Sequence, residues 1–164
     1  MLGLAPTAAA GSGRTCPDSD VASDTVSPLR VERATLCLLN QERTMRALRP
    51  LIVSRWLRAA ALNHSRAMVY RHYFAHQSPR LLARVARLRC GSPRYGCGVG
   101  ENLAWVRSRR STPEKIVEAW MGSPHHRENI LYRPYSQVGI GIARGVPFYW
   151  GLTGTTYTVD FGTS

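Results

Sequence analysis

Long apolar runs and lysine are the two features that this sequence lacks most clearly. No apolar segment in its 164 residues approaches the roughly 20 residues that a membrane-spanning helix needs, so no transmembrane segment is predicted. Lys115 is the only lysine, and the net charge of +12 therefore comes almost entirely from arginine. Twelve of the arginines lie between Glu42 and Glu101, in a stretch that contains no acidic residue.

A chain this basic is expected to attract polyanions. Anionic cell-wall polymers such as teichoic acids, an anionic lipid surface, heparin-like glycans and nucleic acid would all suit its charge. The alternative is a solvated basic face without a dedicated partner. Nucleic acid is disfavoured as a dedicated target, because none of the usual nucleic-acid-binding signatures is present in the sequence.

The common catalytic and metal-binding motifs are absent as well. The sequence contains neither the HExxH motif of zinc hydrolases nor the GxSxG motif of serine hydrolases. It contains no CxxC pair, which argues against a zinc site built from four cysteines. Any chemistry must therefore come from side chains that are distant in sequence.

The length of the chain and its 44% hydrophobic content predict one domain with a flexible end. We expect a flexible tail over residues 1–27 and the domain over residues 28–164. The tail begins like the end of a secretory signal peptide, because Ala8-Ala9-Ala10 fits the small-residue cleavage pattern. A disordered terminus rich in alanine and glycine is the alternative, since the charged start of a signal peptide is missing.

Four cysteines are consistent with export. Cys90 and Cys97 bracket a turn-rich hexapeptide that can bring their sulfur atoms together, which leaves Cys16 and Cys37 for each other. Three connectivities are open from the sequence alone, and this local pairing is the simplest. Disulfides imply an oxidising compartment, so the chain is predicted to be secreted and extracellular.

Helices are predicted in the first two thirds of the chain. The first spans about residues 29–47, and a short basic one spans residues 81–88. Another begins after Thr112, with Pro113 in its first turn, and ends at residues 122–124. A further helix begins after Ser54 and carries a buried stripe at helical spacing, in which His64 is interpreted as a core histidine: Leu57, Ala60, Ala61, His64 and Met68.

Strands are predicted near the C-terminus. Val138, Ile140 and Ile142 alternate with small residues, and residues 148–152 and 156–161 are expected to form two more strands. Residues 98–105 are expected to form a loop. Helices followed by strands indicate an α+β fold in which helices pack on an antiparallel sheet.

Six phrases, in this order and spacing, resemble the CAP superfamily, also called the SCP-like extracellular domain. That group includes cysteine-rich secretory proteins, antigen 5 and pathogenesis-related proteins, and the chain is most similar to its bacterial secreted branch over roughly residues 36–162. The phrases are Leu38-Leu39-Asn40-Gln41-Glu42-Arg43, Ala60-Ala61-Leu62-Asn63-His64-Ser65, Tyr73-Phe74-Ala75-His76, Gly100-Glu101-Asn102-Leu103-Ala104, Ala119-Trp120-Met121-Gly122-Ser123-Pro124-His125-His126-Arg127 and Val138-Gly139-Ile140-Gly141.

The resemblance implies a three-layer α-β-α sandwich and a cleft where two histidines and two glutamates bind a divalent cation such as zinc or magnesium. By motif position His76 and His126 look like the two histidines, and Glu101 looks like the first glutamate. His125 is expected to be an exposed neighbour. Ser123 stands at the place of the second glutamate, which weakens the metal site.

Two other glutamates lie near that part of the sequence. Glu118 lies two residues before Trp120 and is expected to face elsewhere, while Glu128 is too near His126 in sequence to be assigned.

Three roles for the site stay open at this point. Two imidazoles and one carboxylate could hold zinc with an open coordination position. Alternatively, they form a buried hydrogen-bonded cluster in which Asn102 and Asn129 pin loops. The third role is a binding groove lined by aromatic side chains: Tyr73, Phe74, Trp105 and Tyr132.

The favoured hypothesis is a secreted binding module at the cell envelope. Its alternatives are a metal-dependent hydrolase that acts on protein or cell wall, and a carrier of lipid or sterol. The sequence carries no clear trace of the oligomeric state.

Overall fold

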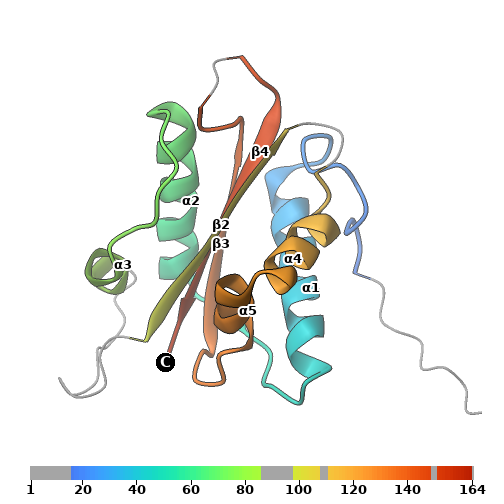
Figure 1. The fold of residues 1–164 in the computed structure, drawn as a ribbon, viewed down its shortest axis with the longest axis vertical. Helices are drawn as coiled ribbons and strands as arrows, with labels where there is room; N and C mark the ends of the chain where they lie inside the picture. Colours follow the sequence, from blue (N-terminus) through green and yellow to red (C-terminus); the bar gives the residue numbers. More distant parts are fainter. Residues whose placement is uncertain (1–15, 86–97, 108–110, 149–150, 164) are drawn as a thin grey trace, which may run out of the picture.

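The computed structural model describes residues 16–85, 98–107, 111–148 and 151–163. Figure 1 shows three layers, with a sheet between two groups of helices. One outer layer holds α2 (Arg55–Tyr70) and α3 (Pro79–Val85). The other holds α1 (Pro28–Thr44), α4 (Pro113–Gly122) and α5 (Pro124–Leu131). The predicted three-layer α-β-α sandwich is therefore confirmed.

The sheet has four strands in the order β1-β3-β4-β2. Its antiparallel part consists of β2 (Val99–Arg107), β3 (Gln137–Arg144) and β4 (Gly154–Gly162). The two-residue strand β1 (Ile52–Val53) adds to β3 in parallel. The sheet is therefore mixed, while its three long strands are antiparallel as predicted.

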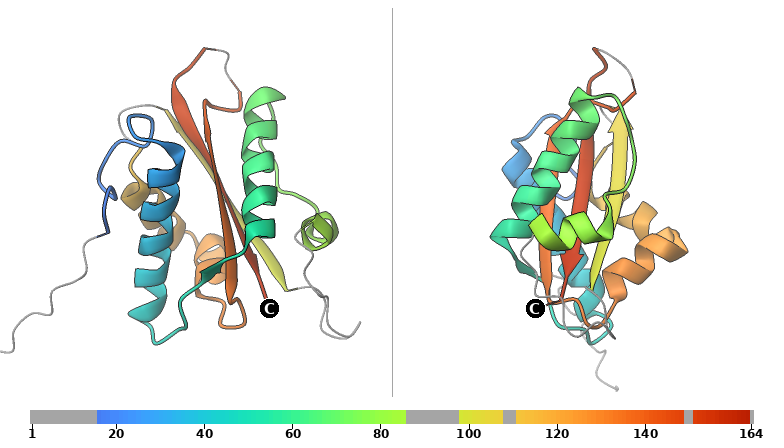
Figure 2. Two further views of the ribbon diagram at one scale, coloured as in Figure 1. Left: turned by 180° about the vertical axis from the view of Figure 1, so that it is seen from behind. Right: turned by 90° about the vertical axis from the view of Figure 1, so that its left-hand side faces the viewer.

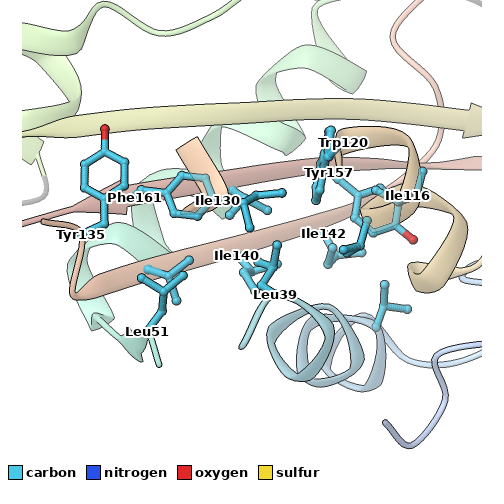
Figure 3. Packing of buried hydrophobic residues seen from close by; sticks show 14 residues of the cluster. Leu39, Leu51, Ile116, Trp120, Ile130, Tyr135, Ile140, Ile142, Tyr157 and Phe161 are labelled. Carbon is cyan, nitrogen blue, oxygen red and sulfur yellow. The ribbon is translucent and has the colours of Figure 1, made fainter. Parts of the chain in front are cut away.

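The central strand β4 is buried over its whole length and divides two environments. Tyr157, Val159 and Phe161 point into the main apolar core, which lies between the sheet and the layer of α1, α4 and α5 (Figure 3). The residues between them point the other way, toward α2: the hydroxyl of Ser65 on α2 donates to Oγ1 of Thr158 over 2.8 Å. This period-two alternation places Asp160 on the α2 side of the sheet.

Helix α2 packs so closely against β3 that no side chain fits between them at two glycine positions. A Cβ atom added at Gly139 would come 2.0 Å from the Leu57 carbonyl carbon, and one added at Gly141 would come 2.1 Å from that of Ala61. The two glycines are thus required by the close approach of helix and strand. The predicted apolar stripe of α2 is confirmed, because all five of its residues are buried.

One arginine lies inside the opposite layer. Arg43 on α1 is completely buried. Its guanidinium donates to the carbonyl oxygens of Arg49, Ile130, Tyr132 and Tyr135 over 2.8 to 3.1 Å. Burial of the guanidinium lowers its pKa. It therefore joins α1 to the loop after α5 as a hydrogen-bond donor, without a carboxylate partner among its contacts in the described structure.

Residues 16–27, which belong to the predicted tail, are packed on the domain. Cys16 is bonded to Cys37 of α1, as predicted. Ser23 is buried and shares a hydrogen bond with the hydroxyl of Tyr157. Cys90 and Cys97 lie outside the described residues, as do residues 1–15 with Ala8-Ala9-Ala10.

Two element predictions were wrong, and one helix was not predicted. Residues 98–105, predicted as a loop, lie mostly in the nine-residue strand β2. The described residues of 148–152 form no strand, and β4 begins only at Gly154. Helix α4 ends at Gly122, as predicted, but Pro124 begins the further helix α5, because proline suits the first turn of a helix.

The other helix predictions were close to the structure. Thr112 caps α4, with its hydroxyl oxygen accepting from the N–H of Lys115 over 3.3 Å. Ser54 stands at the start of α2 but makes no side-chain capping bond. No helix in the described ranges is both long and apolar enough to cross a membrane.

Candidate functional site

The imidazole of His76 and the carboxylate of Glu101 form the centre of the site. His76 lies in the segment between α2 and α3, and Glu101 lies on β2. Nδ1 of His76 is 2.8 Å from Oε1 of Glu101. Because an ionised carboxylate only accepts hydrogen bonds, Nδ1 carries a proton, and Nε2 is the basic nitrogen of the neutral ring. The His76 side chain is 60% exposed and the Glu101 side chain only 6% exposed, so the imidazole is the accessible member of the pair.

Gln77 binds the same carboxylate through two donors. Its backbone N–H donates to Oε1 of Glu101 over 2.9 Å, and its side-chain Nε2 donates to Oε2 over 3.0 Å. Together with the bond from His76, the Glu101 carboxylate accepts three hydrogen bonds from two consecutive residues. Glu101 therefore anchors the segment between α2 and α3 to the sheet.

His64 on α2 borders the same carboxylate. It is 8% exposed, and its Nε2 lies 2.9 Å from the carbonyl oxygen of Ala75, which confirms the interpretation as a satisfied core histidine. The same Nε2 lies 3.6 Å from Oε2 of Glu101, and Nδ1 lies 3.4 Å from the hydroxyl of Tyr73. The helical stripe placed His64 in the core, and only the fold brings it beside Glu101.

Asp160 is the residue of the site that the sequence analysis missed. It is completely buried on β4, directly opposite Glu101 in the β2–β4 register. Neither carboxyl oxygen accepts a hydrogen bond from a donor in the described structure. Burial, and then the adjacent charge and carboxyl group of Glu101, raise the pKa of Asp160 well above its usual value, although Gln77 acts in the opposite direction. The buried pair therefore favours a neutral Asp160, which can donate its proton toward Glu101.

Asn102 connects the other face of β2 to α5. Its Nδ2 donates to the carbonyl oxygen of His126 over 3.0 Å, and its Oδ1 accepts from Nδ2 of Asn129 over 2.9 Å. Nδ2 of Asn129 also lies 3.2 Å from the carbonyl oxygen of Glu101. The two asparagines therefore pin a helix to the strand, where the sequence analysis had expected them to pin loops.

His126 approaches from the α5 side of β2, and His76 from the side of α2 and α3. Burial lowers the pKa of His126, and the neighbouring imidazoles of His76 and His125 lower it further. A neutral imidazole is the form that binds a metal ion or accepts a hydrogen bond. The two predicted histidines are therefore electrostatic neighbours at the edge strand β2.

The other residues near the second histidine form no hydrogen bond or ion pair with the Glu101 side chain in the described structure. Ser123 forms the junction of α4 and α5, where its N–H donates to the carbonyl of Trp120 and its carbonyl accepts from the N–H of Arg127. Glu118, Glu128 and His125 are exposed. The additional carboxyl group at the site therefore comes from Asp160 on β4.

The predicted aromatic groove is divided by the fold. Phe74 and Trp105 both contact Phe148 edge to face, with ring centroids 6.4 and 5.9 Å apart. Tyr73 contacts His64 instead, at 6.0 Å between ring centroids. Tyr132 packs on Tyr135, at the C-terminal end of α5. Only Phe74 and Trp105 thus share an aromatic cluster, and its third member, Phe148, is 49% exposed.

The donor set fits a metal ion only in part. His76 fits, because a carboxylate that holds Nδ1 orients the ring and leaves Nε2 to coordinate. Glu101 fits less well as a direct ligand, because its side chain is buried and its carboxylate already accepts three N–H donors. Across the described ranges, no group of three histidine, cysteine, aspartate or glutamate residues is placed to hold a metal ion. Cation binding, whether zinc or magnesium, therefore stays a prediction that would rest on His76 and His126.

Comparison with known proteins identifies close similarity to one family. Residues 36–150 match the sequence profile of CAP, the cysteine-rich secretory protein family. The YkwD protein of Bacillus subtilis is 34% identical over 110 residues, which cover 67% of this chain and 41% of YkwD. The matched region thus spans less than half of that relative.

Two solved structures share the fold. An extracellular protein from Bacillus anthracis that contains an SCP domain superposes with a TM-score of 0.60 at 22% identity, over 85% of this chain and 44% of that one. An outer surface protein from Borrelia burgdorferi superposes with a TM-score of 0.65 at 15% identity, over 84% of this chain and 96% of that one.

Proposed function

The chain belongs to the cysteine-rich secretory protein (CAP) family, and on this basis we propose that it is a secreted binding module of the cell envelope. The Cys16–Cys37 disulfide supports secretion, because such bonds persist in oxidising compartments. The structural neighbours described as an extracellular protein and an outer surface protein support the same location.

The hydrogen bonds that Glu101 accepts are the main observation in support of a binding function. A general base must reach the proton that it removes, and a metal ligand must offer a free oxygen. Glu101 is buried, and both of its oxygens hold the segment of His76 and Gln77 on the sheet. The role of the Glu101 carboxylate is therefore structural. What remains accessible is the imidazole of His76 beside it and, in contact with Phe74 and Trp105, the exposed ring of Phe148, which suit recognition.

Retention on envelope components tests this function directly. The purified protein is passed over immobilised cell-wall polymers and mixed with anionic liposomes, at low and at physiological salt. Retention at low salt that weakens as salt rises is expected, because a chain of net charge +12 is attracted to polyanions. Absence of retention on every matrix at low salt would refute the proposal.

A metal-dependent hydrolase is the second candidate, and the orientation of His76 favours it. A carboxylate that fixes one ring nitrogen and leaves the other exposed also occurs in catalytic histidines and metal ligands. The purified protein and a His76→Ala variant are incubated with zinc or magnesium and with protein and cell-wall substrates. Turnover by the parent that the variant loses would establish this candidate, and equal turnover by both would eliminate it. A role as lipid or sterol carrier stays a prediction.

A further inference from the structure

The sheet separates a strongly basic helical layer from a neutral one (Figure 2). The basic layer, here defined as the α2–α3 layer, spans residues 55–85 and contains no aspartate or glutamate. The opposite helices α1, α4 and α5 carry five basic and five acidic residues: Arg30, Arg33, Arg43, Lys115 and Arg127 against Glu32, Glu42, Glu114, Glu118 and Glu128. The six arginines of the α2–α3 layer are Arg55, Arg58, Arg66, Arg71, Arg80 and Arg84.

Most of these arginines are exposed and without a carboxylate partner. Arg58 is half-buried and paired with Glu32 of α1 over 2.6 Å, and Arg55 lies over the ring of Trp56 at 4.6 Å. The other four are exposed, and none of them forms an ion pair within the described structure. Because neither buried acid of the site reaches this surface, four uncompensated guanidinium groups remain on one side of the molecule.

We propose that the α2–α3 layer is the docking surface for a linear polyanion that carries repeated phosphate groups. The inference rests on the proposed binding function and assigns it to the arginines of this layer, and not to the imidazole of His76. Guanidinium groups bind phosphate oxygens through paired, charge-assisted hydrogen bonds. Arg55 and Arg66 are eleven residues apart on α2, about 16 Å along the helix axis. Such a span suits several units of an extended polymer.

The surface favours a soluble polymer over a bilayer. A helix that lies in a membrane interface presents a continuous apolar face to the lipid. The exposed positions of α2 over its middle turns are small or polar instead, including Ala59, Asn63 and Arg66, and Tyr70 is the large exposed ring at its end. Among the described side chains of the layer, Tyr70 and Leu81 are the large apolar ones that are exposed, so little apolar area is available to insert into lipid.

We expect one unit of such a polymer to bind in a recess beside α2. It has a volume of about 530 Å³ and lies between the end of α2 and β3. Arg66 and Tyr70 line it one helical turn apart, with Tyr70 83% exposed. Arg144 lines the opposite side, and its guanidinium is held by the carbonyl oxygens of Asp24 and Val26. A charged group would meet Arg66 there, while a ring or an alkyl segment would rest on Tyr70.

Two matched triple variants test the assignment. The first, Arg66→Gln, Arg71→Gln and Arg80→Gln, removes three charges from the α2–α3 layer. The control, Arg33→Gln, Arg127→Gln and Arg133→Gln, removes three exposed charges from other parts of the molecule. Binding of long-chain inorganic polyphosphate to the parent and to both variants is measured across a series of salt concentrations. Circular dichroism and thermal melting verify that both variants are folded.

The parent is expected to bind with a steep salt dependence. The α2–α3 variant should lose at least tenfold in affinity, and its logarithmic salt slope should fall by about two, because each neutralised phosphate contributes roughly 0.7 to 0.9. The control should stay within about threefold of the parent, because long-range attraction to net charge is screened by salt.

The other outcomes separate the two proposals. If the parent binds polyphosphate and both variants weaken equally, the layer is not the docking surface, while the binding function stands. If the parent binds anionic liposomes but not polyphosphate, the polymer assignment is overturned. If the parent binds neither these probes nor any cell-wall polymer at low salt, the proposed function itself fails.

Discussion

Glu101 and Asp160 face each other across β2 and β4, and both carboxyl groups are buried on the α2 side of the sheet. Glu101 accepts three N–H donors from His76 and Gln77, whereas Asp160 accepts none in the described structure. The hydrogen-bond donors are thus distributed unequally over the pair. Burial and the neighbouring carboxyl group of Glu101 raise the pKa of Asp160 and favour its neutral form.

Asp160→Asn is expected to make the protein less sensitive to rising pH. The raised pKa of Asp160 means that the folded state retains a proton that the unfolded chain has already released. Stability therefore falls as pH rises from the unfolded pKa toward the folded pKa, and the full penalty is present above the latter. An asparagine amide can donate to Glu101 at every pH. In urea unfolding at a series of pH values, the free energy of unfolding of the variant should rise relative to that of the parent as pH rises. A difference that stays constant with pH would contradict a neutral Asp160.

Glu101→Gln should weaken the hydrogen bonds that hold the segment with His76 and Gln77 on the sheet. An amide oxygen cannot accept three N–H donors as a carboxylate does, so we expect a loss of about 2–4 kcal/mol in the free energy of unfolding. Amide hydrogen exchange at the backbone N–H of Gln77, which donates to Glu101, should accelerate. Glu128→Gln on the exposed face of α5 is the control and should change neither quantity. Unchanged exchange at Gln77 in the Glu101 variant would show that the anchor is unimportant.

Arg43→Met should be among the most destabilising single substitutions. It leaves four carbonyl oxygens without their donor, so we expect a loss of at least about 3 kcal/mol. Arg46 lies one turn further along the chain, and its guanidinium makes exposed contacts with Glu42, an ion pair with the carboxylate and a hydrogen bond to the carbonyl oxygen. Arg46→Met should therefore cost less than about 1 kcal/mol. Chemical denaturation of both variants measures the contrast, and similar losses would mean that burial of Arg43 is not what matters.

Replacement of Cys16 and Cys37 by serine should destabilise the domain through its unfolded state. The two residues are 21 positions apart, and closure of a loop of that length contributes about 3 kcal/mol on the chain-entropy model. The midpoint of denaturation should fall. The hydrogen bond between Ser23 and Tyr157 should also break more readily, because Ser23 lies in the segment that Cys16 holds to α1. Thermal melting of the double variant beside the oxidised parent is the measurement. An unchanged midpoint would show that residues 16–27 hold to the domain without the bond.

Zinc is expected to stabilise the protein only through the imidazoles of His76 and His126. If His76 and His126 share the ion, the zinc-induced rise in melting temperature should vanish in His126→Ala and persist in His125→Ala, whose imidazole is exposed. The rise should also shrink as the solution is made acidic, because zinc requires neutral imidazoles. Differential scanning fluorimetry with and without a chelator measures both effects. A response that survives in His126→Ala places the ion elsewhere.

The sequence predicted the parts of this fold that depend on local patterns. The stripe of α2 recurs at helical spacing, the cap of α4 combines Thr112 with Pro113, and the alternation of β3 has period two. Strand β2 was missed because Glu101 and Asn102 are polar, although both are buried. Their burial is compensated by partners on α5 and on the segment after α2, and no pattern within residues 98–105 reveals those partners.

The candidate site divides in the same way. The short motifs around His76, Glu101 and His126 were sufficient to select these residues, because each motif is a local pattern that the sequence shows directly. Asp160 left one local sign, a polar position in the alternation of residues 156–161, and this sign is shared by Thr156 and Thr158. Its role depends on the register that sets it opposite Glu101, and register is a property of two strands.

By itself, the sequence determined the family, four of the helices and the excess of arginine over residues 43–100. Only the tertiary structure decided what these residues do. It placed Asp160 against Glu101, committed the Glu101 carboxylate to three hydrogen bonds, and gathered six arginines on one side of the sheet. The physical reason is that burial, hydrogen-bond partners and surface charge depend on segments far apart in the chain, which meet only when the sheet pairs and the helices pack on its two faces.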